Sequence, residues 1–116
     1  MTMMRNAYTA VIARGEVWQG GTVHTEPYEA AWAAEAVFFV HVMAVIGAPG
    51  GVATAQVQIS PDGLHWVNEG ASMDIQAQSQ ALSFARVSNF GGWLRLAVEV
   101  PHGVGIQVVA TLALKG

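Results

Sequence analysis

Apolar and polar residues alternate with a period of two over most of the chain after residue 36. The clearest run is residues 93–100, whose two alternating sets are Leu94, Leu96, Val98 and Val100 on one side and Trp93, Arg95, Ala97 and Glu99 on the other. Residues 52–60 and 105–115 alternate in the same way. Because successive side chains of a β-strand point to opposite faces, these runs predict strands with one buried face.

The run 37–46 differs from the others because both of its alternating sets are apolar. One set is Phe38, Val40, Val42, Ala44 and Ile46, and the other is Val37, Phe39, His41, Met43 and Val45. Such a strand is either central and covered on both faces, or it presents one face to another subunit. The wider stretch 30–48 is long and apolar enough for a membrane span. Its ionisable Glu35 and His41 and its β-branched and aromatic residues favour a strand instead, so we expect no membrane partner.

Turn residues separate these runs at short intervals. Ser60-Pro61-Asp62-Gly63 predicts a type I turn with a glycine bulge, which joins residues 52–60 to a strand over 64–67 in a hairpin. Pro101-His102-Gly103 is expected to end the strand over 93–100.

The remaining segments are less regular. Short strands are expected at 7–13, 16–19 and 22–26, a helical turn within the alanine-rich 28–36, and an exposed loop at 70–80 with an edge strand at 73–75. The chain shows no internal repeat and no linker. These features predict one all-β domain over residues 1–116, an antiparallel β-sandwich or jelly-roll of about seven to eight strands. Residues 1–6 are expected to form a flexible or clasping N-terminal arm.

The composition suggests that this domain does not function alone. Hydrophobic residues make up 53% of the 116 residues and charged residues 11%, against about 25% charged in an average domain. With so little charge, some apolar side chains are expected to lie outside the core and to be buried by other subunits. The contact residues predicted are Val37, Phe39, His41, Met43 and Trp93. The alternative is a monomer whose surface is rich in alanine, glycine and glutamine.

The ionisable residues point away from several other functions. A net charge of −3, with only five scattered basic residues, argues against nucleic-acid binding. The absence of cysteine excludes disulfides and thiolate sites, and it favours assembly in a reducing cytoplasm. The four histidines lack the spacing of metal ligands, and the chain has no nucleophile elbow or phosphate loop. We therefore expect no enzyme activity, no metal and no cofactor, and we see no secretory signal peptide.

The tryptophans leave a second function open. Trp93 is predicted to share an outward face with Arg95 and Glu99, where an aromatic ring flanked by polar groups could stack on a sugar. The competing interpretation is that Trp66 closes the core of the hairpin and Trp93 fills a protein interface, since tryptophan is enriched at such positions.

Two segments carry a resemblance to known proteins. The hairpin S-P-D-G-L-H-W at 60–66 and the later strand V-S-N-F-G-G-W-L-R-L-A-V-E-V at 87–100 resemble small β-sandwich proteins of tailed-phage and prophage structural gene clusters. The similarity covers residues 22–115 and rests on an S-x-D-G-x-x-W hairpin. It implies turn or core roles for Pro61, Asp62, Gly63 and Trp66 and a structural role for Arg95. Discoidin-like binding domains share the hairpin, but they are longer and often disulfide-linked.

The expected function is therefore a non-catalytic structural subunit, such as a head-decoration or capsid-stabilising protein of a phage virion. It would be assembled in the host cytoplasm, and its partners would be a shell or capsid protein and further copies of itself as a homo-oligomer. The alternative is a carbohydrate-binding β-sandwich module that uses exposed tryptophans. A subunit of a non-viral compartment or filament would behave in the same way as the viral subunit.

Overall fold

The computed structural model describes residues 7–116, and the expected N-terminal arm over residues 1–6 lies outside the described residues. The described chain is all-β and contains seven strands, as the sequence predicts. In chain order they are β1 (Ala7–His24), β2 (Tyr28–Glu29), β3 (Glu35–Val45), β4 (Val52–Ser60), β5 (Val67–Gln76), β6 (Leu82–Ser88) and β7 (Trp93–Lys115).

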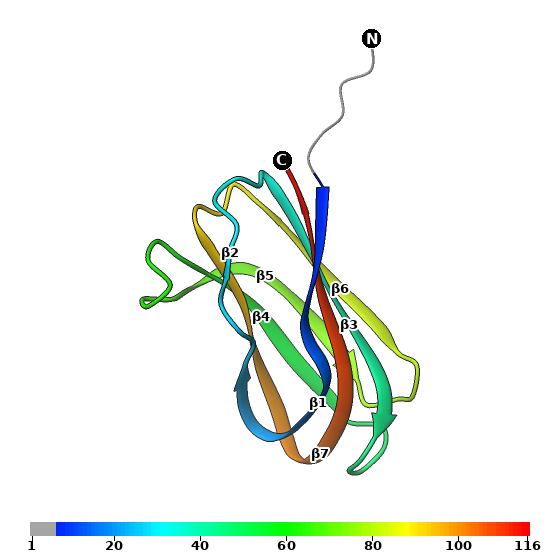
Figure 1. Ribbon diagram of the computed structural model, residues 1–116. Helices are drawn as coiled ribbons and strands as arrows, with labels where there is room; N and C mark the ends of the chain where they lie inside the picture. Colours follow the sequence, from blue (N-terminus) through cyan, green and yellow to red (C-terminus); the bar gives the residue numbers. More distant parts are fainter. Residues whose placement is uncertain (1–6) are drawn as a thin grey trace.

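All strand pairs are antiparallel, and β7 connects two layers. Its first part pairs with β4, and its second part pairs with β3, so that the hydrogen-bonded order is β5-β4-β7-β3-β6. β1 pairs with β7 along both parts, and β2 pairs with the start of β7. The result is a sandwich in which one layer is β6-β3-β7-β1 and the other is β5-β4-β7 with β2 and the end of β1 (Figure 1).

β1 and β7 are each one long bent strand, which corrects two predictions. The sequence indicated three short strands over 7–26, but Ala7–His24 is continuous. It also indicated a break at residues 101–103, but β7 runs through them. The widest of the register shifts in this pairing lies between Gln19↔Gly105 and Gly21↔Val100, where Gly21 and Gly103 have φ angles of 124° and 85°. Glycine tolerates these angles, so both strands bend there and continue into the other layer (Figure 1).

The hairpin between β4 and β5 is confirmed, but its boundaries differ from the prediction. β5 begins at Val67, so residues 64–66 belong to the connecting loop rather than to a strand. β5 then continues to Gln76, so the edge strand expected at 73–75 is confirmed as part of a longer strand, and the loop expected at 70–80 is limited to its last residues. In that segment Met73 and Ile75 are buried and alternate with exposed polar residues, which is the pattern of a strand at a sheet edge. The alanine-rich segment contains β2 and a turn at residues 31–32 instead of a helical turn.

The core lies between the two layers and is formed by the alternating apolar faces predicted for β4 and β7. Its largest fully buried side chains include Trp18, Phe38, Ile75, Leu94, Leu96, Ile106 and Leu112. Burial of each such side chain stabilises the fold by about 1.5–3 kcal/mol relative to exposure. β3 contributes Phe38, Val40 and Val42 to this core. Within residues 7–116 no helix is long and apolar enough to cross a membrane.

Candidate assembly surface

The candidate surface is the side of the β6-β3-β7-β1 layer that points away from the core. Paired residues of antiparallel strands lie on the same face, so the pairing defines three cross-strand rows. The central row is Phe84, Phe39, Thr111 and Val11; its neighbours are Arg86, Val37, Ala113 and Thr9 on one side and Leu82, His41, Val109 and Arg14 on the other. We call these residues the outer face. None of them is fully buried.

Two phenylalanines form the centre of the outer face. The ring centroids of Phe39 and Phe84 are 6.3 Å apart, and the ring planes are tilted by 41°. Phe84 is 53% exposed, and its neighbour Leu82 is 65% exposed. The Arg86 guanidinium lies over the Phe84 ring, 5.5 Å from its centroid. Phe39 is half-buried. Aromatic side chains next to an arginine are typical of the buried centre of a protein interface.

Two further predicted contact residues lie on the same strand. The His41 Nε2 atom is 3.0 Å from the Gln80 Oε1 atom, which fixes the ring at the edge of the outer face. Met43 sits at the bulge between Val42 and Ala44 and is 40% exposed. The structure therefore brings Val37, Phe39, His41 and Met43 together on the outer side of β3.

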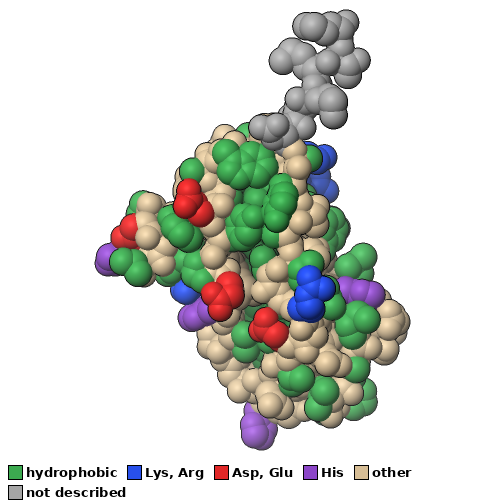
Figure 2. Space-filling model, in the orientation of Figure 1, with side chains coloured by type: hydrophobic (Ala, Val, Ile, Leu, Met, Phe, Trp, Pro, Cys, Tyr) green, Lys and Arg blue, Asp and Glu red, His purple; other side chains and the backbone are tan. Residues whose placement is uncertain are grey.

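Charged side chains lie at the edges of the outer face rather than at its centre. Arg86 and Arg14 occupy its corners, and the row beyond Val37 contains Glu35 and Lys115 as paired residues. Figure 2 shows one side of the whole molecule, on which charged side chains are isolated and hydrophobic side chains lie between them. An apolar centre with charges at the perimeter favours contact with another protein surface.

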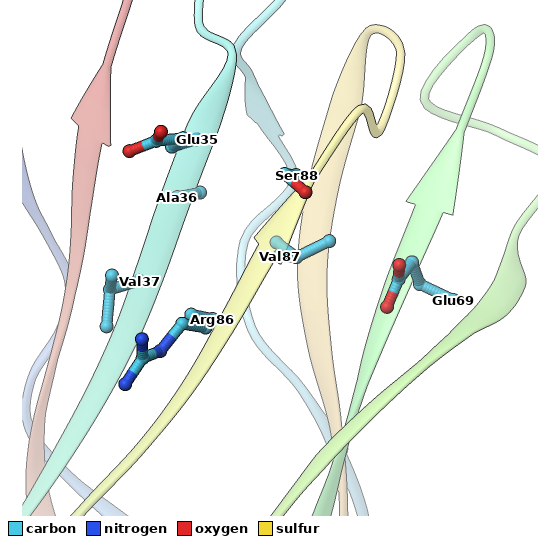
Figure 3. Close-up of a pocket in the computed structure, with 7 residues that line it drawn as sticks. All are labelled: Glu35, Ala36, Val37, Glu69, Arg86, Val87 and Ser88. Carbon is cyan, nitrogen blue, oxygen red and sulfur yellow. The ribbon is translucent and has the colours of Figure 1, made fainter.

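A polar hollow of about 400 Å³ lies beside the outer face, where β5 and β6 separate (Figure 3). It is lined by Glu35, Ala36, Val37, Glu69, Arg86, Val87 and Ser88. The Glu69 carboxylate accepts a hydrogen bond from the Ala71 amide at 3.0 Å, which holds it at the β5 side. Among residues 7–116 no three His, Cys, Asp or Glu side chains are grouped closely enough to hold a metal ion. Val37 and Arg86 belong to both the hollow and the outer face, so the hollow forms a border of the outer face.

Trp93, the fifth predicted contact residue, lies elsewhere. It begins β7, pairs with Ser60 of β4, and belongs to the other layer. A Cβ atom added at Gly63 would lie 3.2 Å from the Trp93 indole, so the hairpin loop covers part of this ring. Trp93 is half-buried against its own chain and does not extend the outer face.

The loop over residues 61–66 is held by side-chain hydrogen bonds to its own backbone. Ser60 Oγ accepts from the Gly63 amide at 2.8 Å, and Asp62 Oδ1 accepts from the Leu64 and His65 amides, both at 2.9 Å. Asp62 Oδ2 also lies 2.6 Å from His65 Nδ1. These bonds to the charged carboxylate hold the pKa of Asp62 well below its usual value. Asp62 and Gly63, which has a φ of 78°, thus shape the turn.

Arg95 and Trp66 are in contact on the outside of the second layer. The Arg95 guanidinium lies 4.3 Å from the centroid of the Trp66 ring, and its Nε donates to Gln58 Oε1 at 2.7 Å. Partial burial lowers the pKa of Arg95. Trp66 is half-buried and is not part of the core cluster, so the expectation that it closes the hairpin core is wrong. Its ring instead covers the arginine.

Sequence reasoning missed the strand that completes the outer face. In residues 82–88 the larger Leu82 and Phe84 point outward, whereas Ala85 and Val87 point into the core. The alternation is visible in the sequence, but residue size suggests the opposite orientation. Sequence reasoning also missed an aromatic group at the other edge of this layer, formed by Tyr8, Tyr28 and Trp32.

The comparisons with known proteins identify a shared β-sandwich fold. No protein-family model matches the chain, and no curated protein matches its sequence. The structure resembles the SPBc2 prophage-derived protein YomS with a TM-score of 0.63, 7% identity, and coverage of 100% of this chain and 98% of that one. It also resembles a chain of Bacillus endospore appendages, described as disulfide-linked pili, with a TM-score of 0.53, 8% identity, and coverage of 97% and 91%.

A third similar structure is a chain of infectious bursal disease virus, Gx strain, with a TM-score of 0.55 and 13% identity. The match covers 96% of this chain but only 32% of the viral chain. At such low identities the likeness is one of fold. The prophage-derived protein agrees at that level with the resemblance seen in the sequence.

Proposed function

We propose that this protein is a non-catalytic structural subunit that binds other protein subunits through the outer face. The observation that carries the proposal is the exposure of Leu82 and Phe84, with Phe39 half-buried beside them, although none of the three belongs to the core cluster. Burial of apolar surface stabilises association by roughly 25 cal/mol per Å² before the costs of ordering. A subunit contact gives these side chains a physical role that an isolated monomer does not.

The particular assembly proposed is a phage virion, in which the protein decorates or stabilises the head. Support comes from the fold, which is shared with a prophage-derived protein and with a chain of a virus structure. The similarity to an appendage protein described as a pilus supports the broader class of repeating assemblies. In an assembly the same modest contact is repeated by symmetry, so many weak contacts together hold the particle.

Sedimentation velocity over a hundredfold range of protein concentration tests this proposal. The full chain is expected to form a dimer or larger species as concentration rises. Leu82→Asp is expected to shift this association to at least tenfold higher concentration, because a buried unpaired charge opposes the contact. Two results together would contradict the proposal. The parent protein would stay monomeric over the whole range, and Leu82→Asp would not change how much protein is incorporated into particles from cells that carry the gene.

Leu64→Asp is the matched control for this experiment. Leu64 is 78% exposed, but it lies in the hairpin loop rather than on the outer face. The substitution makes the same chemical change at an equally accessible leucine. Association of Leu64→Asp is expected to equal that of the parent, and equal weakening in both variants would show a nonspecific effect of charge.

A further inference from the structure

A second group of exposed aromatic side chains lies at the end of the sandwich where β1 begins. Tyr8, Tyr28 and Trp32, together with Ala7, line a hollow of about 400 Å³. Tyr8 is 55% exposed and Trp32 47% exposed, while Tyr28 is half-buried. Figure 2 shows large hydrophobic side chains gathered at this end of the molecule. The group is separate from Phe39 and Phe84, because Tyr8 lies on the opposite edge strand of the layer from β6.

The turn that carries Trp32 is held firmly in place. The Ala33 amide donates to the Ala30 carbonyl at 3.0 Å and closes the turn. The flanking residues are fixed to both layers of the sandwich: the Ala30 amide donates to the Gly92 carbonyl at 2.7 Å, and the Ala34 amide donates to the Lys115 carbonyl at 2.8 Å. Trp32 is therefore exposed on a fixed backbone, which lowers the entropic cost of binding a ligand.

Among the described residues, the lining combines aromatic rings with hydroxyl groups and contains no charged side chain. Partial burial, together with the neighbouring Tyr8 side chain, raises the pKa of Tyr28. A tyrosine hydroxyl can donate and accept hydrogen bonds. Because the described lining residues include no cation, they favour a neutral ligand over phosphate or nucleic acid.

We infer that the Tyr8–Tyr28–Trp32 hollow binds a neutral saccharide, with one sugar ring stacked on the Trp32 indole. The face of an aromatic ring is electronegative and attracts the C–H hydrogens on one side of a pyranose ring. The tyrosine hydroxyls are positioned to hydrogen-bond the sugar hydroxyl groups. A hollow of this size lies in the range of small-molecule sites, about 300–1,000 Å³. This binding activity is separate from the assembly role proposed above.

Isothermal titration of the full chain with cellohexaose, maltohexaose and chitohexaose tests the inference. At least one of these neutral oligosaccharides is expected to bind with a dissociation constant in the micromolar to low millimolar range. Trp32→Ala is expected to weaken that binding at least tenfold, Trp32→Phe less, and Tyr8→Phe about threefold through loss of a hydroxyl. Leu64→Ala, an exposed apolar residue away from the hollow, serves as the control and should bind as the parent does.

Three outcomes would overturn the inference. The first is that none of the three sugars binds at concentrations up to 10-fold above the low millimolar range. The second is that Trp32→Ala binds the sugar as tightly as the parent does. The third is that the Trp32 ring becomes shielded from solvent, as measured by its fluorescence, only when the protein concentration rises. That result would assign the hollow to a contact between copies of the chain. Sedimentation of Leu82→Asp reports on the outer face alone, so failure of the saccharide site leaves the assembly proposal standing, and the reverse also holds.

Discussion

The guanidinium group of Arg95 lies over the indole of Trp66, 4.3 Å from the ring centroid, and connects β7 to the hairpin loop. A cation–π contact of this kind contributes about 0.5–2 kcal/mol, depending on how far it is removed from water. The additional hydrogen bond from Arg95 Nε to Gln58 Oε1 ties the same group to β4.

Arg95→Met is expected to lower the free energy of unfolding by about 1–2 kcal/mol, because it removes both interactions and keeps the apolar stem. Trp66→Leu should have a smaller effect. In a double-mutant cycle measured by urea denaturation and circular dichroism, the pair should show a coupling of at least about 0.5 kcal/mol. Additive effects of the two substitutions would mean that the contact does not stabilise the fold.

Adjacent phenylalanines of β3 are expected to differ sharply in their contribution to stability. Phe38 is fully buried, so Phe38→Ala should lower the free energy of unfolding by about 3–5 kcal/mol. Phe39 lies on the outer face, so Phe39→Ala should cost less than about 1.5 kcal/mol and should weaken self-association in sedimentation. Urea denaturation of dilute protein separates the two effects. A large loss of stability in Phe39→Ala would place its ring in the monomer core.

The sequence predicts which residues of β3 share a side, but it does not predict which side faces the core and which faces outward. Both alternating sets are apolar, and only the structure shows that Phe38 faces the core and Phe39 faces outward. Likewise, the period of two correctly predicts β4 and the buried face of β7. These features are local, since they follow from the alternation of side chains within a single strand.

Features that depend on distant pairing were not predictable in this way. Pro101 and Gly103 interrupt a local pattern, yet the strand continues because β1 bends beside it at Gly21. The orientation of β6 depends on the limited space between the layers, which accepts Ala85 and leaves Phe84 outside. The aromatic hollow likewise joins Tyr8 of β1 with Tyr28 of β2 and with Trp32, which follows β2. Their spacing along the chain does not indicate that these residues lie close together.

Two glycines beside the bend of β7 are expected to be intolerant of larger residues. A Cβ atom at Gly47 would collide with the Gly103 carbonyl oxygen and would lie 2.7 Å from the Gly105 nitrogen, both of which are backbone atoms. A Cβ atom at Gly51 would collide with a methyl group of Val104. Because side chains move more easily than backbone, Gly47→Ala should destabilise the protein more than Gly51→Ala, by about 3 against about 1 kcal/mol.

Thermal unfolding of these variants checks the expectation. The double variant Gly51→Ala with Val104→Ala should recover part of the packing lost in Gly51→Ala, since the colliding methyl group is gone. The same Val104→Ala change should not rescue Gly47→Ala. Equal destabilisation by both glycine substitutions would argue that the close approach to the β7 backbone is not maintained.

The hairpin loop should give the protein a specific sensitivity to acid. The pKa of Asp62 is lower in the folded protein than in the unfolded chain, because the Leu64 and His65 amides and the His65 ring bond its carboxylate. This carboxylate therefore stabilises the fold above about pH 5, and the contribution declines as acidification protonates the unfolded chain and then the folded one.

Asp62→Asn is expected to lower the free energy of unfolding more at pH 7 than at pH 3, as measured by urea denaturation. Asp74→Asn, which replaces an exposed carboxylate on β5 outside this loop, is the control. An Asp62→Asn effect that is the same at both pH values would show that the charge of Asp62 does not stabilise the turn.

The pairing of β1 with β7 has a consequence for how the chain folds during synthesis. β1 has no other partner strand among the described residues, and Ala7 pairs with Lys115 at the opposite end of the chain. During synthesis the first strand therefore waits unpaired until the last one leaves the ribosome. Neither layer can close before β7 has been synthesised, and folding that depends on such distant pairing is slow.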